Sequence, residues 1–503
     1  MKKNLAQNIA LLILLTFLLK GIGFVNRIVI AYYFGTTVMT DIYYNASGFT
    51  DSVSAVILAS LTVGVINIYL SNKGNKKTDR FISDLLIICI CGLLAISTIV
   101  LLFADQISIM LAPAYTNQNR EMLSHMLRVM CFTFPFQGAI AVYSAILQAE
   151  QRFTPLKLIG TITSVISIGC VILLTNYMGI NSLVVAYIAG IIFNALFLAF
   201  NSRKLFNFSL RRVKINDDLR KLLILIGPIA IGIAAHEINL IVDKAVASGI
   251  EKGAISALSY SCVLYLFIEN VIINSIVTAF LPNLTEKVLN KEENIIADNT
   301  KNVIFFAEIL LIPIVIVSLF YSDTIIKYIY MRGSFGGSSL QLTKYALQGY
   351  ILGLPFLALR DISMQVFYAY GDTKTPIKIN TGIVVVNVIL DFILSKYWGV
   401  FGITFATSFA SMLSGVILLF KLKIYNKNIL DSALIQFGIS EIIVVVILCF
   451  VAWFTKCILG NIFGFIIASI LLLLLQLLLL FKNELMKGNR DKVISRIKKN
   501  KES

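Results

Sequence analysis

The chain has 503 residues, of which 58% are hydrophobic and only 14% are charged, and its mean hydropathy is +0.86. A water-soluble domain cannot bury that much apolar surface, so the composition excludes a soluble enzyme and indicates a protein of many membrane spans. The formal net charge of +16 would suit a nucleic-acid partner, but the basic residues lie in loops beside apolar segments, and we expect none.

Fourteen apolar segments are long enough to cross a bilayer as helices, and the sequence therefore predicts an all-α polytopic membrane protein. The first segment is followed by no small-residue cleavage site, so we interpret it as a retained helix and not as a signal peptide. In chain order the predicted spans are 8–33, 40–70, 82–104, 124–149, 156–176, 181–200, 221–248, 254–284, 302–321, 344–370, 376–396, 400–420, 437–456 and 460–481.

The basic residues predict the orientation of these spans. Fourteen spans place both termini on one side of the membrane, and most of the 43 Lys and Arg residues fall in loops on that side. Loops rich in Lys and Arg stay in the cytoplasm, so both termini are expected to be cytoplasmic. The opposite loops hold Arg120, Lys252, Lys327, Arg332, Lys344, Lys396 and Lys456.

A repeat organises the apolar chain. Three motifs recur about 220 residues later, and two of them contain proline, of which the chain has only eight: Pro135-Phe136 with Pro355-Phe356, Thr154-Pro155 with Thr375-Pro376, and Tyr177-Met178-Gly179 with Tyr397-Trp398-Gly399. Duplicated six-helix units are typical of transporters whose halves move around a shared site. The predicted domains are two six-helix repeat lobes at 1–202 and 222–425, a basic cytoplasmic linker at 203–221, extra helices 13 and 14 at 426–482, and a basic cytoplasmic tail at 483–503.

Charged residues inside the predicted spans are candidates for a substrate cavity. Each costs about 2.5–3.5 kcal/mol at mid-membrane and needs a partner or a wet cavity. Lys20 and Arg27 lie on one stripe of the first span, about 10 Å apart, with no acid on that stripe. Asp41 and Asp51 of the second span are candidates to balance them.

A second set of polar residues lies in the predicted C-terminal lobe. Asp243, Lys244 and Arg360 complete the candidate substrate-binding residues, and a candidate polar network for coupling is formed by Glu237, Glu269, Asn387 and Asp391. Internal ion pairs that only orient the bundle remain an equal alternative for Asp243–Lys244 and for Arg360–Asp361. The sequence contains no catalytic, metal-ligating or cofactor-binding motif, so we expect a protein that is not an enzyme and has no cofactor.

Several motifs together resemble one known family. They are Gly23-Phe24-Val25-Asn26-Arg27, Ala31-Tyr32-Tyr33-Phe34-Gly35, Asn239-Leu240-Ile241-Val242-Asp243, Arg332-Gly333-Ser334-Phe335 and Asp372-Thr373-Lys374-Thr375-Pro376. In this order they resemble the MviN/MurJ family of lipid II flippases, within the superfamily of multidrug, oligosaccharide-lipid and polysaccharide exporters. The resemblance covers roughly residues 5–425.

The resemblance implies two six-helix lobes, a cationic central cavity, a polyprenyl-pyrophosphate-linked sugar as substrate, and an apolar groove for its lipid tail at the two extra helices. The family's first-span arginine falls on Lys20, its second on Asn26 beside Arg27, and its aspartate on Asp41. Departures from the pattern thin the cationic cavity: the basic pair of span 2 falls on Ser54 and Ala55, the arginine of span 8 falls near Val263, and a Pro-Asn pair has become Thr50-Asp51.

The sequence therefore predicts a multi-pass protein of the bacterial cell membrane that moves a lipid-linked cell-wall precursor from the cytoplasmic to the outer leaflet. Its expected partners are that lipid-linked glycan and the bilayer, with enzymes of cell-wall synthesis as further candidates. Three alternatives stay open: a flippase for an exopolysaccharide or teichoic-acid unit, which the missing arginines favour; a cation or drug antiporter of the same superfamily; and a non-transporting scaffold.

Overall fold

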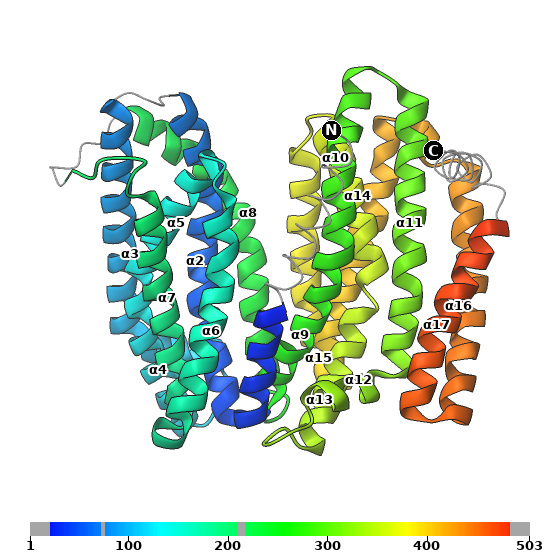
Figure 1. Ribbon diagram of the computed structural model, residues 1–503, viewed down its shortest axis with the longest axis horizontal. Coiled ribbons are helices and arrows are strands. Elements are labelled where there is room, and N and C mark those ends of the chain that lie inside the picture. Colours follow the sequence, from blue (N-terminus) through cyan, green and yellow to red (C-terminus); the bar gives the residue numbers. More distant parts are fainter. Residues whose placement is uncertain (1–20, 72–75, 210–216, 483–503) are drawn as a thin grey trace, which may run out of the picture. The chain divides into compact units, whose positions relative to one another are not determined.

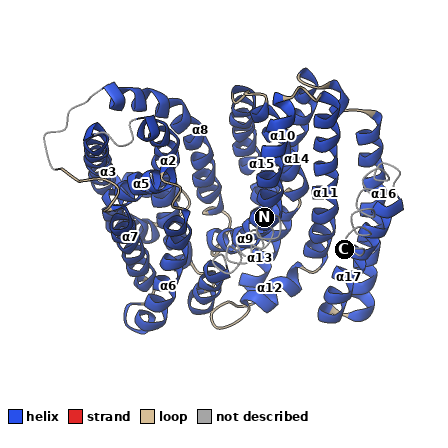
Figure 2. Ribbon diagram, turned by 45° about the horizontal axis from the view of Figure 1, so that its top comes forward, coloured by secondary structure: helices blue, strands red, loops and turns tan. Residues whose placement is uncertain are grey.

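The computed structural model describes residues 21–71, 76–209 and 217–482, and every regular element in this part is a helix (Figures 1 and 2). The predicted all-α class is thus confirmed. After a first helix, Gly21–Phe34, the elements are α2 (Val38–Ser71), α3 (Lys76–Leu111), α4 (Asn117–Met130), η1 (Cys131–Thr133), α5 (Phe134–Ala149), α6 (Phe153–Met178), α7 (Asn181–Ser202), α8 (Asp217–Ala247), α9 (Ala254–Ile268), η2 (Glu269–Ile273), α10 (Asn274–Leu289), α11 (Glu293–Phe320), α12 (Ser322–Tyr330), α13 (Gly337–Ile351), α14 (Leu354–Ala369), α15 (Lys374–Lys421), η3 (Leu422–Ile424), η4 (Lys427–Ile429), α16 (Ser432–Leu459) and α17 (Asn461–Lys482).

Ten helices in the described residues are long and apolar enough to cross a membrane, and two shorter apolar helices, Gly21–Phe34 and Asn461–Gln476, accompany them. One of the ten, Lys374–Ile424, covers two predicted spans, which meet at a kink at Gly399, where the backbone is not helical. A protein that crosses the membrane many times is confirmed, whereas the number fourteen stays a prediction.

The repeated motifs fold alike. Pro135 and Pro355 each occupy the first turn of a helix, α5 and α14, directly after a break in the preceding helix. Each of these helices ends in the same reverse turn, closed by bonds from Arg152 N to Leu147 O (2.8 Å) and from Asp372 N to Phe367 O (2.9 Å). The sequence repeat therefore encodes equivalent breaks in the backbone.

Gly179 and Gly399 show the repeat most clearly. Gly179 has φ 53° and ψ −131°, and Gly399 has φ 57° and ψ −134°. Side chains other than hydrogen are strongly disfavoured in this region of φ/ψ space. The two glycines thus turn the chain from one span into the next, between α6 and α7 and within α15.

We expect Gly179→Ala to lower the free energy of unfolding by about 1–3 kcal/mol, because a methyl group at this φ strains the backbone. The effect is conformational and not steric, since no heavy atom lies within 4 Å of the added Cβ. Gly160→Ala in the interior of α6 is the matched control: its Cβ also meets open space, and it should stabilise the helix by about 0.5–1 kcal/mol. Thermal unfolding of the purified variants measures both. Equal effects of the two substitutions would contradict the assignment.

Contacts divide the chain into two units, each described by itself. Unit 1 comprises Met1–Val263, Tyr330–Thr343 and Val388–Ile403, and unit 2 comprises Leu264–Ile329, Lys344–Asn387 and Thr404–Ser503. The predicted lobes, linker and tail stay a prediction beside this division.

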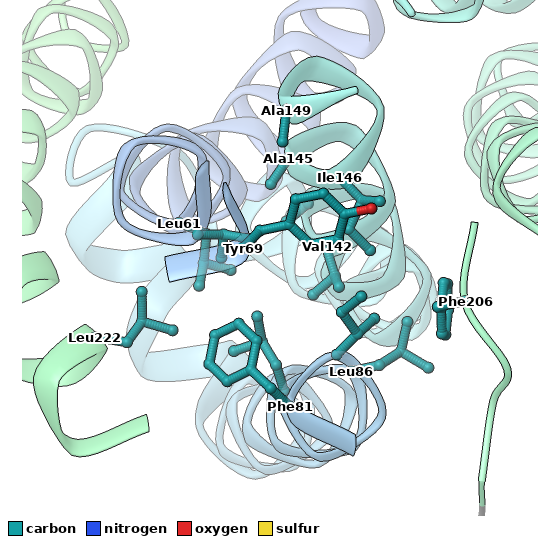
Figure 3. Close-up of a cluster of buried hydrophobic side chains, with 14 of the residues drawn as sticks. Leu61, Tyr69, Phe81, Leu86, Val142, Ala145, Ile146, Ala149, Phe206 and Leu222 are labelled. Atoms are coloured by element: carbon teal, nitrogen blue, oxygen red, sulfur yellow. The ribbon is translucent and has the colours of Figure 1, made fainter. Parts of the chain in front are cut away.

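A core of buried side chains holds one end of unit 1 together (Figure 3). Leu61 and Tyr69 of α2, Phe81 of α3 and Ile146 of α5 interdigitate there, and Leu222 adds the first turns of α8. Burying each large side chain contributes about 1.5–3 kcal/mol. This core fixes α2 against α8, and these are the two helices that carry most of the charged candidates of unit 1.

In unit 2, α16 and α17 run side by side along α11 (Figure 1). Lys301 of α11 donates to Asp431 (2.6 Å), which also caps the first turn of α16. At the other end of α16, Lys456 donates to Asp323 (3.1 Å). Apolar packing along the length and one ion pair at each end thus attach the two extra helices to this unit.

Candidate functional site: a line of charges along α2

One face of α2 carries Tyr44, Gly48 and Asp51, which are spaced four and three residues apart and so lie above one another. Lys244 of α8 crosses this face, and its Nζ donates to the backbone oxygen of Tyr44 (3.1 Å). The ammonium group lies where a Cβ on residue 48 would stand. Glycine at position 48 therefore makes the room that brings the charge of Lys244 against α2.

Arg27 belongs to the same line. Its guanidinium carbon lies 5.1 Å from the centre of the Tyr44 ring, within the range of a cation–π contact. Tyr44 is in turn held edge-on against Tyr260, 5.7 Å between ring centres, and Tyr260 donates to the backbone oxygen of Gly35 (3.0 Å). An aromatic group of the fold thus fixes the surface on which Arg27 rests.

Asp51 is the exposed acid of the line. The hydroxyl of Tyr187 on α7 donates to its Oδ1 (2.7 Å), and Gln137 on α5 donates to the Tyr187 oxygen (3.3 Å). Arg27, Lys244 and Glu237 all act on Asp51 electrostatically. The structure therefore brings together four of the predicted residues: Arg27, Asp51, Glu237 and Lys244.

Asp41 is placed differently from the other candidates. It is only 2% exposed, and its two oxygens accept from the backbone nitrogens of Gly253 (2.6 Å) and Ser256 (2.7 Å) and from the Ser256 hydroxyl. These donors form the start of α9, where unpaired N–H groups attract a carboxylate. Asp41 thus joins α2 to α9, and the hydrogen-bonding capacity of its oxygens is directed at the protein.

Asp243 and Asp391 form a carboxylate pair in the same unit. Their side chains lie against one another, both are buried, and Asn239 donates to Asp243 (3.4 Å). Within the described residues, neither oxygen of Asp391 has a conventional hydrogen-bond donor. Two buried carboxylates in contact cannot both be ionised, so the pair must hold a proton or another cation.

Arg360 lies in unit 2, paired with its neighbour. Its Nε and Nη2 both reach Oδ1 of Asp361 at 2.8 Å, and Glu269 is the next charge to act on this pair. Glu269 begins the π-turn η2, a local widening of the helix that often occurs at functional sites. Asn387, the last residue of this segment of unit 2, is buried. Lys20 lies outside the described residues.

Sequence reasoning missed three residues that shape the line of charges: Gly48 on α2, Gln137 on α5 and Tyr187 on α7. A signal for two of them was present, because Gln137 and Tyr187 are polar groups in the middle of apolar spans and need a partner there. Gly48 gave no signal, because its role depends on a lysine almost 200 positions away.

Comparison with known proteins decides the family. A family model described as "Lipid II flippase MurJ" matches residues 30–475. The chain belongs to the MurJ family. The resemblance seen in the sequence motifs is thereby confirmed, and with it a multi-pass protein of the bacterial cell membrane.

Curated MurJ relatives match most of the chain. A "Probable lipid II flippase MurJ" of Rickettsia prowazekii (strain Madrid E) is 27% identical over 413 residues, 80% of each chain. A protein of the same name from Buchnera aphidicola subsp. Baizongia pistaciae is 26% identical over 432 residues, 83% of each chain. These relatives support the main function predicted from the sequence over its alternatives.

Solved structures show the same fold. A structure titled "Lipid II flippase MurJ, inward closed conformation" superposes with a TM-score of 0.82 at 23% identity, covering 94% of this chain and 99% of the other. An inward-facing multidrug resistance MATE family transporter of the MOP superfamily follows with a TM-score of 0.70 at 13% identity, covering 81% and 94%. At these identities the likeness is one of fold, and this chain shares its helical architecture with both structures.

Proposed function

We propose that this protein translocates a polyprenyl-pyrophosphate-linked cell-wall precursor, of the lipid II type, from the cytoplasmic to the outer leaflet. The match of residues 30–475 to the MurJ family carries this proposal. The two cations Arg27 and Lys244 inside an apolar helical unit support it. Charges in a membrane are costly, and the residues that carry them typically mark a substrate or ion site.

The charges along α2 suit a pyrophosphate group. A guanidinium and an ammonium make short, charge-assisted bonds to phosphate oxygens, and these bonds are stronger away from bulk water. Asp51 serves as the resident counter-charge: it balances Arg27 and Lys244 in the empty protein, and a bound pyrophosphate replaces it. Lys20 would add a third cation from the first span. Asp41 holds the start of α9. In unit 2, Arg360 forms a separate polar group with Asp361 and Glu269 and keeps its predicted role in substrate binding.

The coupling residues suit transport by alternating access. Asp243 and Asp391 take up one proton or one monovalent cation, and its release changes the repulsion between α8 and α15. Glu237, on the same helix as Asp243, extends this network, and Asn387 of unit 2 keeps its predicted coupling role. No covalent step is needed, so the protein acts as a transporter and not as an enzyme. Both termini face the cytoplasm, as the Lys and Arg distribution indicates, and enzymes that make or consume the precursor are its candidate partners.

Depletion of the protein in its own host tests the substrate. We expect lipid II to accumulate in the cytoplasmic leaflet and the cells to lyse, because the precursor no longer reaches the wall. Re-expression of the wild-type chain is the control and should restore growth. Loss of a surface polymer without lysis or lipid II accumulation would instead assign the protein to another lipid-linked glycan. Efflux of a cationic dye that depends on the protein would support the antiporter alternative.

A further inference from the structure

Two glutamates lie where the extra helices α16 and α17 pack against α11 in unit 2. Glu308 is on α11 and Glu441 is on α16, and these two helices pack against one another. Glu441 is the charged group that acts on Glu308. Among the described residues neither glutamate has a basic partner, although a charge in such a place is costly unless it is neutralised.

The glutamates form a polar layer between two apolar ones. On one side, Phe305 of α11 packs against Phe437 of α16, with 4.0 Å between the centres of the two tilted rings. On the other side, Ile312 of α11 and Val444 of α16 belong to the apolar cluster that also contains Leu472 of α17. Glu308 lies between positions 305 and 312, and Glu441 lies between 437 and 444. Water therefore has little access to this layer along the helix seam.

Gln476 of α17 completes the layer. It is 2% exposed, and its Nε2 lies 3.3 Å from both carboxylate oxygens of Glu441. Within the described part of the chain, its Oε1 is buried and has no hydrogen-bond partner. A buried acceptor without a donor destabilises the fold, so a hydrogen-bond donor or a positive charge in this layer would stabilise it.

Among the described residues, the basic groups of α11 and α16 are already paired with other acids, and so are two basic groups of neighbouring helices. Lys301 binds Asp298 and Asp431, Lys287 binds Glu292, Lys456 binds Asp323, and Arg360 binds Asp361, with Glu269 acting on that last pair. None of these basic groups is left to neutralise the two glutamates. The amide of Gln476 donates to Glu441, which marks Glu441 as the acceptor and leaves Glu308 to carry a hydrogen.

We propose that Glu308, Glu441 and Gln476 form a proton-binding site at the seam of α11, α16 and α17. One proton resides on the Glu308 carboxyl group, Glu441 stays ionised and accepts from the Gln476 amide, and the free Oε1 of Gln476 can accept from a donor. The bound proton allows α16 and α17 to stay closed on α11, because its loss places two negative charges in one apolar layer. This site is independent of the proposed substrate, and its test involves no translocation.

Infrared difference spectroscopy of the full-length protein in lipid nanodiscs tests the proposal. We expect the wild type to keep a protonated carboxyl band well above pH 4.3, the value near which exposed glutamates ionise. Glu308→Gln should remove that contribution, and the control Glu251→Gln, at an exposed loop residue, should leave it unchanged. An unchanged spectrum in Glu308→Gln overturns the proposal.

A second variant keeps the test decisive if Glu308→Gln does not fold. In Glu441→Gln the neighbouring negative charge is gone, so the carboxyl band of Glu308 should persist but titrate at least about one pH unit lower. An unchanged titration overturns the shared site. The Glu308 band is the one that is present in the wild type and absent from Glu308→Gln. Its loss on addition of Na⁺ or K⁺ at constant pH would show that a metal cation occupies the layer, which also overturns the assignment of a proton.

Discussion

Arg27→Ala is expected to abolish precursor translocation in a protein that still folds. The guanidinium rests on the Tyr44 ring and lies within electrostatic reach of Asp51 and Lys244, so its removal leaves the pyrophosphate with one cation fewer. Arg27 and the bound pyrophosphate form a desolvated charge pair, and truncating one partner of such a pair costs about 2–5 kcal/mol of binding free energy. Complementation of a depleted strain and flipping of lipid II in proteoliposomes measure the loss at matched protein levels.

Arg128→Ala is the matched control, because Arg128 pairs with Asp105 (2.8 Å) at an exposed position. Exposed pairs contribute about 0–1 kcal/mol, so this variant should translocate normally.

Gly48→Ala adds an independent test: the new methyl group displaces the Lys244 ammonium from α2 without removing any charge. Translocation should fall while stability stays near that of the wild type. Full activity of Arg27→Ala would refute the role of the α2 line in substrate binding.

The helical class and the local repeat could be predicted from the sequence because they depend on short-range signals. Apolar runs predict the spans. The repeated motifs predict that Gly179 and Gly399 occupy equivalent places, and both glycines have nearly the same positive φ. The number of spans was harder to predict, because the predicted spans 376–396 and 400–420 follow one another with almost no loop and meet at the Gly399 kink inside α15.

The candidate site was predictable only in part, because pairing partners are set by packing between helices. Asp51 and Lys244 could be singled out as intramembrane charges, but nothing in the sequence shows that Gly48 lets them approach. Asp41 illustrates the opposite limit: its charge was visible, but its hydrogen bonds to the start of α9 depend on a contact more than 200 residues away. Glu308 and Glu441 went unnoticed for the same reason.

Asp391→Asn is expected to separate stability from function. In the wild type, Asp391 is buried against Asp243, and neither of its oxygens finds a conventional donor among the described groups. The amide keeps the shape and removes the need to bind a proton or a cation at this pair, so the free energy of unfolding should stay equal or rise by about 1 kcal/mol. Transport should nevertheless fall sharply, because a single carboxylate no longer shares its cation with a second one.

Thermal unfolding and proteoliposome flipping, each measured across pH and Na⁺ concentration, decide this prediction. In the wild type, the unfolding temperature and the flipping rate should depend on one of these ions, since Asp243 and Asp391 stay in contact only when the pair binds a positive charge. Asp391→Asn should lose that response in flipping, whereas Asp105→Asn, at a carboxylate that is 64% exposed, should keep it. Retained ion dependence of flipping in Asp391→Asn would move the coupling site away from this pair. Destabilisation by several kcal/mol would instead show that the ionised Asp391 is held by attraction, which contradicts two carboxylates that repel one another.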